Sequence, residues 1–121
     1  MDRTFVQTTE FSKRWDALGL NDDDLRRLEM DILQDPSKYP VIQGTGGLRK
    51  ARLAIEQKGK SGSIRVCYVD IVFTETIYLI TVYAKGEKEN LTKAERNHIK
   101  AAVSVLKKNA GGKRNESEKT L

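Results

Sequence analysis

Three consecutive segments decide the fold of this chain: LRKARLAIE (residues 48–56), SIRVCYVDIVF (63–73) and IYLITVYAK (77–85). In each, apolar side chains recur at every second position, the period of a strand with one buried face. The stretch QKGKSG (57–62) separates the first two segments, and a tight turn around residues 74–76 separates the last two. The pattern therefore predicts three consecutive strands of an antiparallel sheet.

N-terminal to these strands, residues 4–8 form a short segment with β propensity and are interpreted as a first strand. From residue 9 the spacing of apolar residues changes to that of a helix. A first helix places Phe11, Trp15 and Leu18 on one face and stops at Gly19. A second begins at the cap residue Asn21 and ends at Pro36. The aspartates at 22–24 lack the spacing of a calcium loop and are interpreted as part of this helix start. Its expected buried residues are Leu25, Leu28, Ile32 and Leu33.

The last helix opens with Thr92 and Glu95, a capping-box pair. It is expected to bury Ile99, Ala102, Val103 and Leu106. The element order strand, two helices, three strands, helix predicts a two-layer α+β domain over residues 1–109, with helices packed on one face of a largely antiparallel sheet. Residues 110–121 are polar, glycine-led and without periodicity, so a disordered tail is expected there.

Charge is distributed unevenly along the 121 residues, whose formal net charge is +5. Residues 1–43 and 69–91 are net acidic, while residues 44–68 and 92–121 each carry a net charge of +5. A basic block in an otherwise slightly acidic domain suggests a polyanionic partner such as nucleic acid, although a solvated basic face would look the same. No apolar run is as long as a membrane span and no signal-peptide core is present, so we expect a cytoplasmic protein.

Strand alternation predicts which residues the helices leave uncovered. The expected core sets are Ala51, Leu53 and Ile55, then Ile64, Val66 and Tyr68, then Tyr78, Ile80, Val82 and Ala84. The opposite, open face would then collect Lys50, Arg52, Arg65, Tyr83 and Lys85, with Lys58 and Lys60 in the neighbouring turn. Cations beside an aromatic ring are suited to gripping phosphates and stacking on a base. The pattern alone does not separate an RNA binder from an RNA-cleaving enzyme.

Other chemistries find little support in the sequence. One cysteine and one histidine cannot form a Cys/His zinc site. Cys67 is interpreted as a structural thiol and His98 as a surface residue, because neither has a partner that would activate it. AIEQKGKS (54–61) fits a relaxed phosphate-loop pattern, but a β-rich segment follows where that loop requires a helix.

Taken together, these elements and motifs resemble the RelE/ParE superfamily of type II toxins over residues 3–108. The segments VIQGTGGLRK (41–50), KGKSGSIRVCY (58–68) and TVYAKGEKENL (81–91) are similar to its HigB-type branch. The resemblance implies a ribosome-dependent endoribonuclease that cleaves mRNA through the RNA 2′-hydroxyl without a metal or other cofactor. It also implies two kinds of partner: the ribosome with its mRNA, and a cognate antitoxin, HigA-like and of the helix-turn-helix type.

The resemblance also assigns roles residue by residue. Arg65 matches the phosphate-stabilising arginine, and Tyr83 fits stacking or proton relay. Lys58, Lys60, Lys85 and Lys88 are candidates for charge stabilisation or proton transfer, and Arg49, Lys50, Arg52 and Lys88 for RNA binding. Some relatives carry a histidine near the end of the last strand, where this chain has Tyr83, Ala84 and Lys85, so the base and the acid remain open. The alternatives are a ParE-like gyrase inhibitor and a non-catalytic RNA-binding module.

Overall fold

The computed structural model describes residues 2–57, 60–88 and 90–120, and side chains within 2–55, 62–88 and 90–110. In chain order its elements are β1 (Thr4–Gln7), α1 (Thr9–Ala17), α2 (Asp22–Gln34), β2 (Arg49–Gln57), β3 (Lys60–Ile71), the 3-10 turn η1 (Val72–Thr74), β4 (Thr76–Ala84) and α3 (Lys93–Thr120). The predicted α+β class and element order are confirmed. The expected tail falls from residue 111 onward outside the described side chains, so it stays a prediction, as does the domain boundary at 109.

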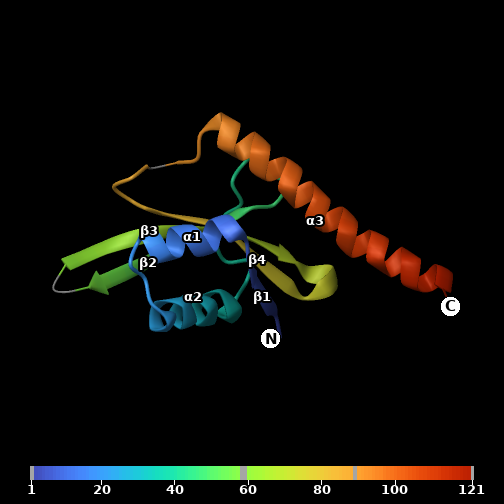
Figure 1. The fold of residues 1–121 in the computed structure, drawn as a ribbon, viewed down its shortest axis with the longest axis horizontal. Helices are drawn as coiled ribbons and strands as arrows, with labels where there is room; N and C mark the ends of the chain where they lie inside the picture. The colour runs from blue at the N-terminus through green and yellow to red at the C-terminus, as the bar shows by residue number, and fades with distance from the viewer. Residues whose placement is uncertain (1, 58–59, 89, 121) are drawn as a thin grey trace.

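The four described strands form one sheet in the order β1-β4-β3-β2 (Figure 1). The pairs β2–β3 and β3–β4 are antiparallel, as expected for consecutive strands joined by short turns. The first strand instead pairs parallel to β4, and α1 and α2 then carry the chain to β2 at the opposite edge of the sheet. The central strands β3 and β4 are therefore flanked on both sides, and the candidate site lies on them.

The first two helices begin where the sequence places their caps. Thr8 accepts the backbone N–H of Phe11 at 3.0 Å. Asn21 and Asp24 form a reciprocal capping box, with N···O distances of 2.9 and 3.1 Å. Gly19 has a φ of 74°, the left-handed conformation expected at a glycine stop. These local signals set the positions of α1 and α2 along the chain.

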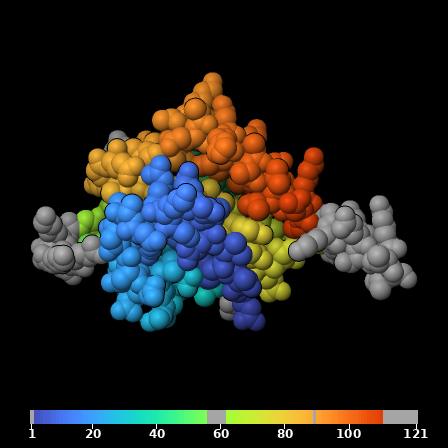
Figure 2. Space-filling model, viewed as in Figure 1, coloured from blue at the N-terminus to red at the C-terminus, as the bar shows by residue number. Residues whose placement is uncertain are grey.

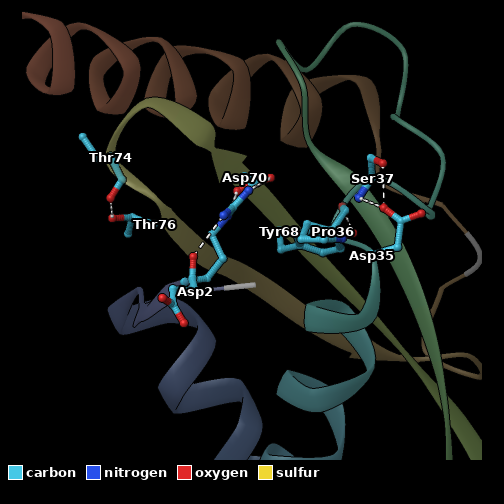
Figure 3. Close-up of polar contacts among 9 residues, drawn as sticks. Asp2, Asp35, Pro36, Ser37, Tyr68, Asp70, Thr74 and Thr76 are labelled. Carbon is cyan, nitrogen blue, oxygen red and sulfur yellow. Dashed lines mark hydrogen bonds and ion pairs between the residues drawn. The ribbon is translucent and has the colours of Figure 1, made fainter.

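One face of the sheet packs against α1 and α2, whose blue and light-blue residues lie at the lower front of the molecule in Figure 2. The strand residues in this core are mostly those expected: Ala51, Ile64, Val66, Tyr68 and Val82, with Leu53 and Ile55 packed at its margin. They meet Phe11, Trp15, Leu28 and Ile32 of the helices. Tyr68 also donates its hydroxyl to the carbonyl of buried Pro36 at 2.7 Å, beside the turn in which Asp35 accepts from Ser37 (Figure 3).

The other face of the sheet is not open, because α3 crosses it (Figure 1). Ile99 and Val103 of α3 form a second buried cluster with Cys67, Ile80 and Tyr83. The expectation that all helices pack on one face is therefore wrong for α3. Ile99 and Val103 of α3 are buried as predicted, and Leu106 packs at the edge of the same cluster. Ala102, which was also expected to be buried, is exposed.

A β-bulge in β4 changes which of its residues face each helix layer. Cys67 pairs with Thr81, but the next residue of β3, Tyr68, pairs with Leu79, so Ile80 is the extra residue. Because of the inserted residue, the side chains of the residues that precede it in β4 point to the opposite faces from those expected. The predicted core positions of Tyr78 and Ile80 are therefore wrong: both pack with the α3 cluster. Ile77 and Leu79 take their place against α1 and α2.

Candidate catalytic site

Arg65 and Tyr83 lie directly opposite each other on β3 and β4. Both are buried, with 5% of Arg65 and none of Tyr83 exposed. The prediction that they lie on an open, solvent-exposed face of the sheet is therefore wrong. For Tyr83 the reason is the packing of α3 on this side of the sheet, because the ring lies in the same buried cluster as Ile99 and Val103. Arg65 donates from Nη1 to the hydroxyl of Ser63 at 3.0 Å, and no carboxylate among the described side chains lies within ion-pair distance of it. An almost buried guanidinium without such a partner favours an anion beside it.

The hydroxyl of Tyr83 is buried and has no hydrogen-bond partner among the described residues. Burial raises the pKa of Tyr83 to about 12, with a further increase from nearby Cys67 and a partial offset by Arg65. At neutral pH the residue is therefore a neutral phenol, which can donate a hydrogen bond but does not act as a phenolate base. Buried polar groups are usually satisfied, so a hydroxyl with no partner among the described residues, opposite a guanidinium with no described carboxylate partner, marks this point as a candidate site.

Lys88 supplies a second cation beside Tyr83. Its Nζ lies 5.4 Å from the centroid of the Tyr83 ring, within the range of a cation–π contact. The same Nζ is 2.5 Å from Oε2 of Glu95. Hydrogen bonds from Lys88 and from the backbone of Thr92 hold the pKa of Glu95 below its usual range. Sequence reasoning identified Glu95 only as a helix cap, and its link to Lys88 had no signal in the spacing.

The remaining predicted site residues are only partly brought together. Arg52 pairs with Arg65 in the sheet register and is exposed, and exposed Lys85 follows the end of β4. Lys50, two residues before Arg52, donates to the side chain of Asn90 at 3.1 Å. Arg49 is not part of this group, because its Nη1 donates to the carbonyls of Ser37 and Tyr39 beyond α2. Lys58 lies outside the described residues, and of Lys60 only the backbone, at the start of β3, is described.

Cys67 does not supply a nucleophile. The thiol is fully buried, and burial raises its pKa to about 12 despite the opposing influence of Lys50 and Lys88. A thiol with so high a pKa is unreactive at neutral pH, which agrees with the structural interpretation of this residue.

A cavity of about 260 Å³ lies next to the Lys88–Glu95 pair. Glu10 of α1, Thr81 of β4 and Glu95 with His98 of α3 line it. Two carboxylates make this cavity unsuited to a phosphate, which favours the side of the site that carries Arg65, Tyr83 and Lys88. His98 is exposed, as expected, and contributes to the cavity wall.

The described part of the chain contains neither a cluster of metal ligands nor a membrane-spanning helix. No group of three His, Cys, Asp or Glu side chains there is arranged to hold a metal ion. No helix within those residues is both long and apolar enough to cross a membrane.

The fold is that of a RelE-type toxin. A solved structure of the E. coli toxin RelE in the free state, a mutant with two arginines replaced by alanine, superposes with a TM-score of 0.51. The match covers 74% of this chain and 90% of that chain at 15% identity, so it shows the fold alone. Residues 4–117 match the sequence family described as the RelE toxin of the RelE / RelB toxin-antitoxin system. The chain belongs to this family of toxins.

Proposed function

We propose that this toxin is an endoribonuclease that cleaves translated mRNA on the ribosome, in the cytoplasm, and thereby inhibits translation. Membership of the RelE family supports the toxin part of the proposal and the existence of a cognate antitoxin. We further propose that the antitoxin is a HigA-like, helix-turn-helix DNA-binding protein, in keeping with the HigB-type segments of the sequence.

One observation carries the assignment of an RNA-cleaving site. The nearly buried guanidinium of Arg65 has no described carboxylate partner and lies opposite Tyr83, whose hydroxyl is also unpaired among the described residues. A phosphate would satisfy both groups, since a guanidinium grips two phosphate oxygens and a phenol donates to a third. Lys88 and the exposed Lys85 add positive charge near the same point.

The chemistry that fits these groups is transfer within the RNA backbone. The 2′-hydroxyl gives its proton to a general base as its oxygen forms a bond to the adjacent phosphorus, and the bond from phosphorus to the 5′-oxygen breaks. The products are a 2′,3′-cyclic phosphate and a 5′-hydroxyl, which receives a proton. Arg65 stabilises the charge that develops on the phosphate, and Tyr83 is the candidate donor to the leaving oxygen. Lys58 and Lys60 stay candidates for proton transfer.

The test uses message cleavage in a translating extract. Arg65→Met keeps most of the volume of the side chain but removes the charge, and it should lower the cleavage rate by about 100-fold or more. Arg26→Met is the matched control, because the Arg26 side chain on α2 is 69% exposed. A message with a single 2′-deoxy nucleotide at the mapped cleavage position should resist the wild-type protein.

Each alternative gives a different result. If Arg65→Met cleaves as fast as wild type while both proteins melt alike, Arg65 does not carry the chemistry. Inhibition of DNA supercoiling by gyrase without message cleavage would identify a ParE-like inhibitor. Salt-dependent RNA binding without cleavage, with ribosomes present, would identify an RNA-binding module.

A further inference from the structure

Glu95 joins the start of α3 to the candidate site through two hydrogen bonds of its carboxylate. Oε1 accepts the backbone N–H of Thr92 at 2.8 Å, as in a capping box. Oε2 accepts from Nζ of Lys88 at 2.5 Å. That ammonium in turn lies 5.4 Å from the centroid of the Tyr83 ring. A residue whose helix-capping role the sequence explains therefore has a second contact that capping does not require.

Lys88 needs such a partner to occupy one position. It follows the turn at residues 85–87, outside any described strand or helix, and its side chain has four rotatable bonds. Glu95, by contrast, stands in the first turn of α3, which packs on the sheet through Ile99 and Val103. Its carboxylate is also fixed by the Thr92 backbone, so the rigid helix limits where the ammonium can lie.

We propose that Glu95 is a positioning residue that holds the Lys88 ammonium beside Tyr83 and so presets the second cation of the phosphate-binding site. The inference rests on the proposed function for its effect on cleavage. Its structural part, the placement of Lys88 over the ring, stands independently. Lys88 is the group that meets the RNA, and Glu95 acts through it.

Two substitutions separate this role from helix capping. Glu95→Gln keeps an oxygen that can accept the Thr92 N–H, since glutamine also serves in capping boxes, but it removes the charge that holds Lys88. Thr92→Ala removes the hydroxyl that accepts the Glu95 N–H at 3.1 Å and leaves the ion pair intact. A purely capping residue would make Thr92→Ala the more harmful change.

The first readout is single-turnover message cleavage. Glu95→Gln should lower the rate about tenfold or more with an RNA affinity within about twofold of wild type, because a misplaced group slows the step without abolishing binding. Thr92→Ala should stay within about twofold of wild type. Lys88→Met should lower the cleavage rate as much as Glu95→Gln does. The double variant should cleave no more slowly than either single variant, because both substitutions disrupt the same Lys88–Glu95 pair.

The second readout does not depend on activity. It is the set of NMR resonances of the Tyr83 ring, which are assigned by comparison with the Tyr83→Phe variant. They should move toward the Lys88→Met positions in Glu95→Gln and remain at the wild-type positions in Thr92→Ala. Equal losses in Glu95→Gln and Thr92→Ala, or unmoved resonances in Glu95→Gln, would overturn the proposal. If wild type itself does not cleave, the proposed function fails and the ring resonances alone decide whether Glu95 holds Lys88.

Discussion

Two buried tyrosines of this protein should respond in opposite ways to loss of the hydroxyl. Tyr83→Phe removes a hydroxyl that is buried without a partner among the described residues. Tyr68→Phe removes one that donates to the Pro36 carbonyl at 2.7 Å. Both rings are fully buried in the sheet, so the same chemical change is made in similar packing environments.

The expected magnitudes follow from the hydrogen bonds. An unsatisfied buried polar group costs about 1–3 kcal/mol, so Tyr83→Phe should leave the free energy of unfolding unchanged or raise it by about 1 kcal/mol. For a domain of this size that is a rise in melting temperature of about 4 °C. Tyr68→Phe should lower the free energy of unfolding by about 1–2 kcal/mol, because the Pro36 carbonyl also loses its partner.

Urea unfolding of the three proteins, with message cleavage measured on the same samples, tests the pair. Tyr83→Phe should combine retained or increased stability with a cleavage rate about 10–100-fold lower, since a proton donor is lost. Tyr68→Phe should cleave normally at temperatures where it is folded. Destabilisation of Tyr83→Phe as large as that of Tyr68→Phe would refute the reasoning, because it would mean that the Tyr83 hydroxyl is satisfied in the folded protein.

Three further outcomes are expected. Asn21→Ala removes the acceptor for the Asp24 N–H and should lower the free energy of unfolding by about 1 kcal/mol, measured by urea titration; an unchanged midpoint would show that the capping box adds nothing. Burial raises the pKa of Cys67 to about 12, so a thiol reagent at pH 8 should label the folded protein at least about 100 times more slowly than the urea-unfolded protein, and equal rates would contradict the burial. The hydrogen bond from Lys88 lowers the pKa of Glu95 in the folded protein. The ion pair therefore stabilises the fold at pH values above the unfolded-state pKa of about 4.3, and this contribution is lost as the pH falls through the folded-state pKa. The difference in the free energy of unfolding between wild type and Glu95→Gln should accordingly shrink on acidification.

The order and approximate bounds of the elements were predictable because their signals are local. The cap at Asn21 and the glycine stop at Gly19 act within a few residues and lie where they were predicted. Alternation also placed Arg65 and Tyr83 on the same face, since both lie on the side of the bulge where the pairing is regular. Glu95 could be identified only as a cap, because its bond to Lys88 spans the connection between β4 and α3.

The sequence by itself determined the strand and helix periods, the basic block and the shared sheet face of Arg65 and Tyr83, all of which follow from spacing along the chain. Only the tertiary structure decided what each face of the sheet meets. The bulge at Ile80 reverses alternation within β4, and no local signal marks it because Ile80 is a good strand residue in either register. The packing of α3 then covers the face that a helix pair alone would leave exposed and buries the Tyr83 ring. Arg65, which was expected in solvent, is itself buried opposite Tyr83, whose hydroxyl has no partner among the described residues.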